Sequence, residues 1–189
     1  MPEMAEGSMA EIAAGSMIDE DADAQSAWIQ QVVDRYEGPL VRYAARITGD
    51  VEQARDVVQE AFLRLCRQQR ASVAGHLDQW LFTVCRNRAL DVRRKETRMQ
   101  IMSDAQATAC ESREPCQAGV LEQSELSGQM LRLLATLPDN QQEVVRLKFH
   151  GGLSYRDISK VTDLTVSNVG YLIHTAIHTL RRELSAELK

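Results

Sequence analysis

The chain has 189 residues, 44% of them hydrophobic and 5% aromatic, and its net charge is −5 at pH 7. Its length suits one domain of ordinary size or two small ones. No apolar run approaches the roughly 20 residues that span a bilayer, and no charged-then-apolar leader opens the chain, so a cytoplasmic protein is expected. Only four prolines and ten glycines interrupt the chain, and alternating Val, Ile and Thr are missing, so the expected fold class is all-α.

The charge is unevenly distributed along the chain. Residues 1–27 hold seven acidic and no basic side chains, whereas residues 28–98 hold thirteen basic and nine acidic ones. Residues 99–136 carry a net charge of −3, and residues 137–189 carry +1. The acidic residues are therefore concentrated in a tail and a linker, while the two remaining blocks are mildly basic.

The first 98 residues divide into a tail and a helical block. Residues 1–27 are rich in Ala, Glu, Asp, Gly, Ser and Met, which predicts a disordered acidic tail. Over residues 28–98 the apolar residues recur at spacings of three and four, which predicts three helices packed into one small domain. Gly49 and Asp50 separate the first two helices, and Asp50 can cap the second. The apolar stripes comprise Val32, Val33, Tyr36, Leu40, Tyr43, Ala44 and Ile47, then Ala54, Val57, Val58, Ala61, Phe62 and Leu65, then Trp80, Leu81, Val84, Cys85, Leu90 and Val92.

A second helical block follows a segment of low periodicity. Residues 99–125 contain a proline and several Ser, Gln and Glu, and we interpret them as a flexible linker. Helical spacing resumes at Leu126, so residues 126–189 are expected to form a second small helical domain. Within it, residues 151–173 predict two short capped helices joined by a tight turn. This pattern is typical of a DNA-binding helix-turn-helix, although a plain corner between two packed helices has the same outline.

The second helix of this motif offers few charges to DNA. Asn168 could pair with adenine in bidentate fashion, and the helix N-terminus, capped by Thr165, suits one phosphate. Because sequence-independent affinity for DNA comes mostly from Lys and Arg, the motif is expected to bind DNA weakly on its own. The outward-facing residues of this helix include Ser167, Asn168, Gly170, Tyr171 and His174.

Two further surfaces of the first domain could bind a partner. Residues 79–98 form a basic segment, in which Asn87, Asp91 and Arg94 share one helix face at spacings i, i+4 and i+7. The second surface is an edge of the preceding helix formed by Asp56, Gln59, Glu60 and Leu63. For both surfaces the ordinary alternative is a helix side that only contacts solvent.

The sequence favours neither an enzyme nor a metal site. It contains no G-x-x-x-x-G-K-[ST], G-x-S-x-G or H-E-x-x-H pattern, so no catalysis and no cofactor are expected. The four cysteines form no C-x-x-C pair, which favours reduced, buried thiols. Two candidate metal sites can be considered, one of Cys110, Cys116 and His76 and one of His174 and His178. The first lacks the spacing of known metal ligands, and the second has no apparent third ligand.

Three blocks, taken in this order, resemble a known family. GDVEQARDVVQEAFLRL (residues 49–65) and QWLFTVCRNRALDVRRK (residues 79–95) are similar to regions 2.1–2.2 and 2.3–2.4 of bacterial extracytoplasmic-function (ECF) sigma factors of the sigma-70 family. Residues 137–184 are similar to region 4 of these proteins. The resemblance covers residues 30–98 and 126–185. It implies a two-domain subunit that binds core RNA polymerase and directs promoter-specific transcription initiation at −10 and −35 elements.

The resemblance also implies a role for each surface. The polymerase-binding edge, which would dock on the β′ clamp, is Asp56, Gln59, Glu60 and Leu63 with Phe62 behind them. The −10 face, which would hold the melted strand together with the loop 69–78, is Asn87, Asp91 and Arg94. The −35 face, which would read duplex DNA, is Ser167, Asn168, Gly170, Tyr171 and His174. Implied partners are core RNA polymerase (β′ clamp and β subunit), promoter DNA, and a regulator such as an anti-sigma factor or a kinase. Because polymerase would carry both DNA contacts, each can be weak alone.

Two departures from the family pattern motivate one alternative function, and a second alternative stands apart from them. Arg55 stands in the usual Ala-Glu-Asp run of region 2.2, and the helix after Val169 lacks the usual basic residues. A sigma-like decoy that binds the core enzyme without opening a promoter is one alternative. A free-standing helix-turn-helix regulator, which would bind its operator without polymerase, is the other.

Overall fold

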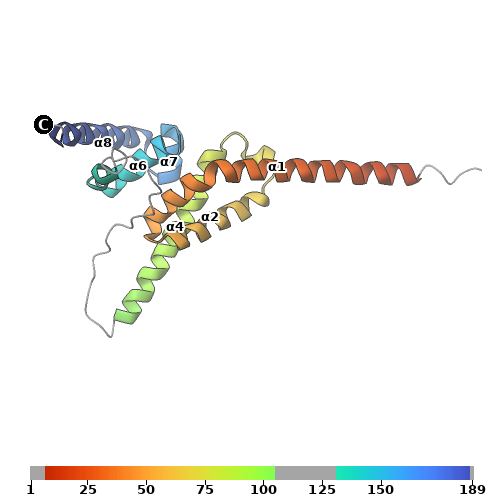
Figure 1. Cartoon of the computed structure of the whole chain (residues 1–189), viewed down its shortest axis with the longest axis horizontal. Helices are drawn as coiled ribbons and strands as arrows, with labels where there is room; N and C mark the ends of the chain where they lie inside the picture. Colours follow the sequence, from red (N-terminus) through yellow and green to blue (C-terminus); the bar gives the residue numbers. More distant parts are fainter. Residues whose placement is uncertain (1–6, 105–130, 188–189) are drawn as a thin grey trace, which may run out of the picture.

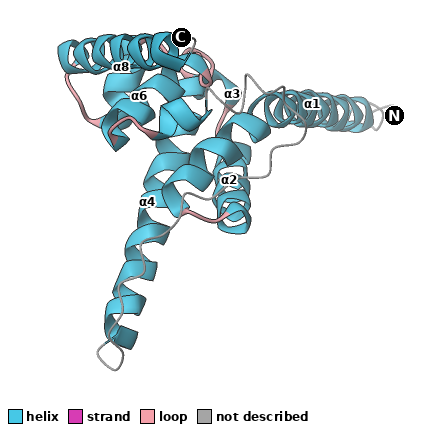
Figure 2. Ribbon diagram, turned by 60° about the vertical axis from the view of Figure 1, so that its left-hand side comes forward, coloured by secondary structure: helices cyan, strands magenta, loops and turns pink. Residues whose placement is uncertain are grey.

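The computed structural model describes residues 7–104 and 131–187, with side chains over residues 23–99 and 131–185. Every regular element in these ranges is a helix (Figures 1 and 2), which confirms the predicted all-α fold class. The helices are α1 (Gly7–Thr48), α2 (Val51–Cys66), α3 (Arg70–Val73), α4 (Leu77–Asp104), α6 (Asp139–Phe149), α7 (Tyr155–Thr162) and α8 (Val166–Glu187).

Helices α1, α2 and α4 form the first domain. Gly49, with a φ of 79°, ends α1 in a conformation that glycine adopts without strain. The Asp50 side chain then caps α2 by accepting a 2.8 Å hydrogen bond from the backbone amide of Gln53. The predicted helix break, its cap and the packing of three helices are thus confirmed. Buried residues of this domain include Leu40, Ala44, Val57, Leu65, Leu81, Phe82 and Cys85.

The acidic tail differs from the prediction of disorder. Helix α1 begins at Gly7, so residues 7–27 are helical and continuous with the packed part of the helix. Figure 1 shows this first half of α1 extending away from the rest of the protein. Alanine, glutamate and methionine are good helix formers, and within α1 no proline occurs before Pro39, so a helix nucleated in the domain can continue backwards.

The predicted linker also begins later than expected. Helix α4 continues through residues 99–104, because the run of Lys, Glu, Arg, Met and Gln after Arg94 contains no glycine or proline. Residues 105–125, and with them Cys110 and Cys116, lie outside the described residues. Residues 131–135 form a helical turn before α6.

Helices α6, α7 and α8 form the second domain. Ser154 and Asp157 make a reciprocal capping box at the start of α7, and the Thr165 hydroxyl accepts a 3.2 Å hydrogen bond from the backbone amide of Asn168 at the start of α8. Between them, Asp163 adopts a left-handed φ of 59° and turns the chain. The helix-turn-helix and its capped helices are therefore confirmed as a fold.

The two domains pack directly against each other, which the sequence did not predict. One continuous buried cluster contains Leu40 and Phe82 of the first domain together with Leu147 and Ile158 of the second. Helix α7 lies against α4, and Figures 1 and 2 both show the group α6–α8 at one end of the first domain. The second half of α4 projects away from this contact.

Candidate functional site

The polymerase-binding edge lies along an open side of α2. Asp56, Gln59 and Leu63 are exposed, and the Leu63 side chain is 56% accessible. Phe62 is half-buried and packs against the core behind them. An exposed leucine flanked by polar side chains on a rigid helix is a suitable anchor for another protein.

Glu60 differs from its neighbours on this edge. Its carboxylate bonds to Arg64 one turn further along α2, at 2.6 Å, and to Arg88 of α4. Burial alone would raise the pKa of Glu60, but the hydrogen bond from Arg64 and the charge of Arg88 outweigh it and hold the pKa below its usual value. Glu60 therefore ties α2 to α4 and presents less free negative charge than Asp56.

The −10 face remains on the open side of α4. Asn87, Asp91 and Arg94 are all exposed, and Arg94 approaches Asp91 at 3.4 Å. Other arginines of the predicted basic segment have partners within the fold: Arg88 bonds to Glu60, and Arg86 bonds to Glu143 of α6 at 2.8 Å. Helix α4 thus has one face exposed to solvent and another face that contacts the second domain.

An open cavity of about 570 Å³ adjoins the start of residues 69–78, which were expected to be a loop but contain the short helix α3 and the beginning of α4. The guanidinium of Arg70 lies 5.8 Å from the centre of the Trp28 ring, and Gln25 donates a 3.4 Å hydrogen bond to the Gln68 carbonyl. Basic and amide groups of this kind can contact a nucleic-acid backbone, whereas the Trp28 ring contacts Arg70 without lining the cavity. The cavity is lined by Ala24, Gln25, Cys66, Arg67, Gln68, Gln69, Arg70 and Ala71.

The −35 face lies on the exposed side of α8. Ser167, Asn168 and His174 are exposed, and Tyr171 is 66% accessible. Gly170 is half-buried beside the Tyr155 ring of α7. The opposite side of α8 holds the helix in place through Val169, Leu172, Ile173 and Ala176, which are buried. The polar residues therefore project from a firmly anchored helix.

Replacing Gly170 with alanine is expected to stabilise the protein by about 0.5–1 kcal/mol, because glycine weakens a helix interior. A Cβ there would meet only the Tyr155 ring, at 3.8 Å. The free energy of unfolding in urea measures the effect. Gly151→Ala is the matched control and should destabilise, because its Cβ would lie 2.7 Å from the Leu147 carbonyl oxygen and 3.1 Å from the Phe82 ring. A loss of stability in Gly170→Ala would contradict the prediction.

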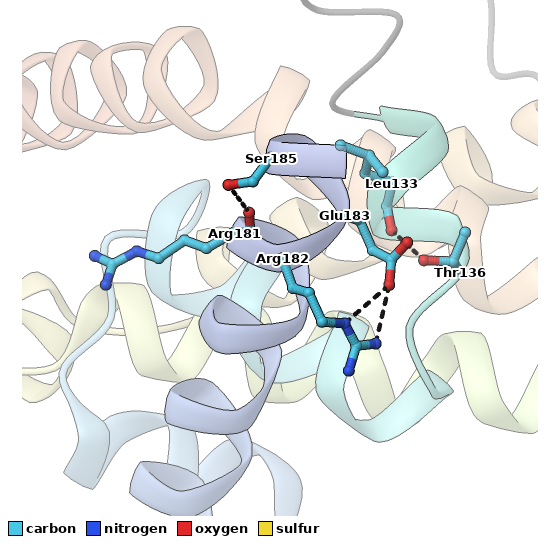
Figure 3. A network of polar contacts seen from close by, with 6 residues as sticks. All are labelled: Leu133, Thr136, Arg181, Arg182, Glu183 and Ser185. Atoms are coloured by element: carbon cyan, nitrogen blue, oxygen red, sulfur yellow. Dashed lines mark hydrogen bonds and ion pairs between the residues drawn. The ribbon is translucent and has the colours of Figure 1, made fainter. Parts of the chain in front are cut away.

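The end of α8 carries two arginines of different character. Arg182 bonds to Glu183 at 2.9 Å, whereas Arg181 points away from this pair (Figure 3). Arg181 accepts a 2.8 Å hydrogen bond from the Ser185 hydroxyl only through its backbone carbonyl. In the same view Thr136 caps the turn before α6 by donating to the Leu133 carbonyl at 2.8 Å. The Arg181 side chain is therefore better placed than Arg182 for a phosphate contact.

A polar network that the sequence analysis missed joins the two domains. Glu143 of α6 accepts hydrogen bonds from the Tyr43 hydroxyl at 2.9 Å and from Arg86 at 2.8 Å. Arg46 donates at 2.7 Å to Gln142, whose amide nitrogen in turn donates to the Leu137 carbonyl at 2.7 Å. Burial, and then the adjacent Glu143, raise the pKa of Tyr43 well above its usual value.

One signal in the sequence could have pointed to this network. Gln142 lies three residues before Val145 and four before Arg146, on the inward side of α6, and it is buried. A polar residue requires hydrogen-bond partners when it is buried. Its partner in the other domain, Arg46, lies 96 residues earlier in the chain and could not be identified from the pattern.

Metal binding and membrane insertion find no support in the part of the chain that the structure describes. No group of three His, Cys, Asp or Glu side chains there could hold a metal ion. Among the same residues, no helix combines the length and apolarity of a bilayer span.

Comparison with known proteins assigns the two domains. The family model for Sigma-70 region 2 matches residues 32–99, and that for Sigma-70 region 4 matches residues 127–180. The chain is 31% identical over 173 residues to the ECF RNA polymerase sigma factor SigL of Mycobacterium tuberculosis, covering 86% of this chain and 92% of SigL. It is 28% identical over 167 residues to the ECF RNA polymerase sigma factor RpoE of Cereibacter sphaeroides, covering 87% and 88%.

A solved structure supports the same fold. The sigma factor RpoE from Bartonella quintana, determined in complex with the anti-sigma factor NepR, gives a TM-score of 0.56 at 22% identity, covering 82% of this chain and 96% of that one. The two matched regions, the identity to SigL and the helix-turn-helix of α7 and α8 agree. The chain therefore belongs to the ECF RNA polymerase sigma factors of the sigma-70 family, and it binds RNA polymerase and directs promoter-specific transcription initiation.

Proposed function

We propose that three separate surfaces of this sigma factor divide the work of initiation. The polymerase-binding edge of α2 docks on the β′ clamp, the −10 face of α4 holds the melted strand, and the −35 face of α8 reads duplex DNA. The observation that carries the proposal is that these surfaces lie on three different helices and are largely exposed, while the opposite sides of the same helices form the core. Each can therefore bind without unfolding the scaffold.

The division of labour follows the domains. We assign core-polymerase and −10 binding to residues 28–98, and −35 binding together with contact to the β subunit to residues 126–189. The family matches over residues 32–99 and 127–180 support this division. The residues between them serve as the connecting linker. The open cavity at Gln69 and Arg70 receives one base flipped from the melted strand.

Promoter binding requires the two domains to separate. The −10 and −35 elements are about 25 base pairs apart, which is about 85 Å at 3.4 Å per base pair. In the packed arrangement, Arg86 bonds directly to Glu143 of the second domain, and Asn87 of the −10 face is its neighbour in the chain. Helix α8, with 22 residues, is only about 33 Å long. The packed arrangement therefore holds the two DNA faces too close together and is a closed state.

The proposal also includes a regulatory partner and a cytoplasmic location for the protein. The structural relative from Bartonella quintana was determined with an anti-sigma factor, and we expect either such a factor or a kinase to restrain this chain. We place the protein in the cytoplasm, where RNA polymerase operates, and assign it no catalytic step of its own.

Run-off transcription with purified core polymerase tests the proposal. Promoter-dependent transcripts are expected with the full chain, and the double variant Asn168→Ala/Tyr171→Ala should lose transcripts from promoters that depend on the −35 element. Core binding without any transcripts would instead support the decoy. Tight binding of the isolated chain to a specific duplex at cellular ionic strength would support the free-standing regulator.

Replacing Leu63 with aspartate is expected to weaken binding to core polymerase by about 30-fold, since a buried apolar anchor contributes about 2 kcal/mol. Leu63 is 56% accessible in the free protein, so its folding should be unaffected. Titration of labelled protein with core polymerase measures the dissociation constant. Met99→Asp, at an exposed apolar position of α4 outside the edge, is the control. Equal affinities of the two variants would refute the assignment of this edge.

Arg55 adds a positive charge beside the polymerase-binding edge, where it bonds to Glu52 at 2.9 Å. Replacing it with glutamate is expected to strengthen core binding severalfold if the β′ clamp presents a basic surface, and the gain should shrink in high salt. The same titration at two salt concentrations measures it. An unchanged or weaker affinity would show that Arg55 does not limit the interaction.

A further inference from the structure

A second cavity lies between the two domains. Its volume is about 340 Å³, and its walls come from the end of α1, from the inward face of α4 and from the start of α6. Arg46 and Ile47 contribute from α1, and Leu90 and Arg93 contribute from α4. Since α6 supplies the remaining wall, the cavity exists only while the domains are packed together. Its lining from α6 is Asp139, Gln142, Glu143 and Arg146.

The charge in this cavity is unbalanced. Arg86 is neutralised by Glu143 at 2.8 Å, and Arg46 bonds to the uncharged amide of Gln142. Three arginines, at positions 46, 93 and 146, then face one remaining carboxylate in the lining, that of Asp139. The cavity therefore carries an excess of positive charge of about two units, and this excess comes from both domains.

Arg146 is the most confined of these arginines. Its Nη1 atom is closed off from solvent and has no hydrogen-bond partner among the described residues. Burial and the charge of Arg46 lower the pKa of Arg146 to about 10, and Asp139 offsets this only in part. A confined guanidinium with too little negative charge beside it destabilises the packed state unless an anion compensates it.

The geometry points to this cavity as a binding site for a small phosphate-bearing anion that bridges the two domains. Guanidinium groups bind phosphate oxygens in bidentate fashion, and arginines from three helices line this cavity. The volume suits a ligand of the size of pyrophosphate or of a small phosphorylated metabolite. Ile47 and Leu90 give part of the wall an apolar character that inorganic phosphate alone does not need.

Binding at this site would be coupled to the arrangement of the domains. Because Arg46 and Arg93 belong to one domain and Arg146 to the other, the anion binds the closed state more tightly than the open one. By linkage it must then favour the closed state by the same factor. This consequence rests on the proposed function, in which promoter binding requires the domains to separate, and it makes the anion an inhibitor of the sigma factor.

Isothermal titration of the full chain with pyrophosphate and with inorganic phosphate, in sodium chloride of matched ionic strength, tests the site directly. Saturable binding is expected, with pyrophosphate the tighter ligand. Arg146→Gln and Arg93→Gln should each weaken it roughly tenfold or more, the loss of one charge-assisted contact. Arg93 is exposed, so its variant tests the site without disturbing the fold. Arg181→Gln, which removes a charge at the far end of α8, should leave it unchanged. No binding of either anion, or equal weakening in all three variants, would overturn the site.

A second measurement tests the coupling separately from the site. Pyrophosphate should reduce the radius of gyration of the free chain in small-angle X-ray scattering, and it should lower the affinity for core polymerase in the wild type but not in Arg146→Gln. Anion binding without either effect would overturn the inhibitory role. Because the titration contains no polymerase, a failure of the proposed polymerase-binding edge would leave its result unaffected.

Discussion

Replacing Phe82 with alanine is expected to lower the free energy of unfolding by about 3–5 kcal/mol, the usual cost of removing a fully buried ring from a packed core. Phe82 is 2% accessible, and it meets the Tyr43 ring edge-on at 5.3 Å between ring centres. Its ring also lies against Gly151 of the second domain. The loss should therefore affect both the first domain and the contact between domains.

Urea denaturation followed by circular dichroism measures this change. Phe149→Ala provides the matched control, because the same ring is 62% accessible there and its removal should change stability by less than about 0.5 kcal/mol. Similar losses in the two variants would show that the cluster around Phe82 does not form in solution.

Replacing Glu143 with alanine is expected to shift the equilibrium between the closed and open states by about 2–4 kcal/mol toward the open one, about 30-fold or more. The carboxylate is the shared acceptor of Tyr43 and Arg86, so its loss leaves a buried hydroxyl and a half-buried guanidinium without that partner. Helix α6 can keep its own fold, since alanine is a good helix former.

The radius of gyration from small-angle X-ray scattering is expected to increase in this variant, and affinity for core polymerase should rise as well. Glu183→Ala removes an equally charged residue from the exposed Arg182 pair and should change neither quantity measurably. A Glu143→Ala protein that scatters like the wild type would show that the polar network does not hold the domains together.

Local patterns in the sequence were sufficient for most of the helices. Apolar spacing identified the packed faces of α1, α2, α4 and α8, and cap residues identified boundaries at Asp50, Ser154 and Thr165. These features depend on neighbours within one turn, which a single sequence displays directly. The ends of long exposed helices were predicted less well: α1 begins earlier, and α4 ends later, than composition indicated. The composition of these segments shows only that they have too few apolar residues to form a core of their own. A helix that is anchored in a neighbouring core can nevertheless continue through such a segment.

For the candidate surfaces, the sequence predicted which residues share a helix face, but it did not predict which residues of other helices they contact. Asn87, Asp91 and Arg94 could be grouped because helical geometry places them on one side. That Arg86 turns inward to Glu143 and Arg88 to Glu60 could not be seen, because each pair joins helices whose relative position is set by packing. The basic segment therefore has fewer free charges for DNA than its sequence suggested.

The all-α class, the helix-turn-helix and the family could be predicted from the amino-acid sequence alone, since periodicity, caps and motif order are local properties of the chain. The contacts of Tyr43, Arg46 and Arg86 with α6, and the placing of three arginines around one cavity, depend on how the helices pack in three dimensions. These contacts join residues between 57 and 100 positions apart. Such pairings form because the two domains bury a shared apolar cluster. The relative placement of two domains produces no periodic pattern of residues along the sequence.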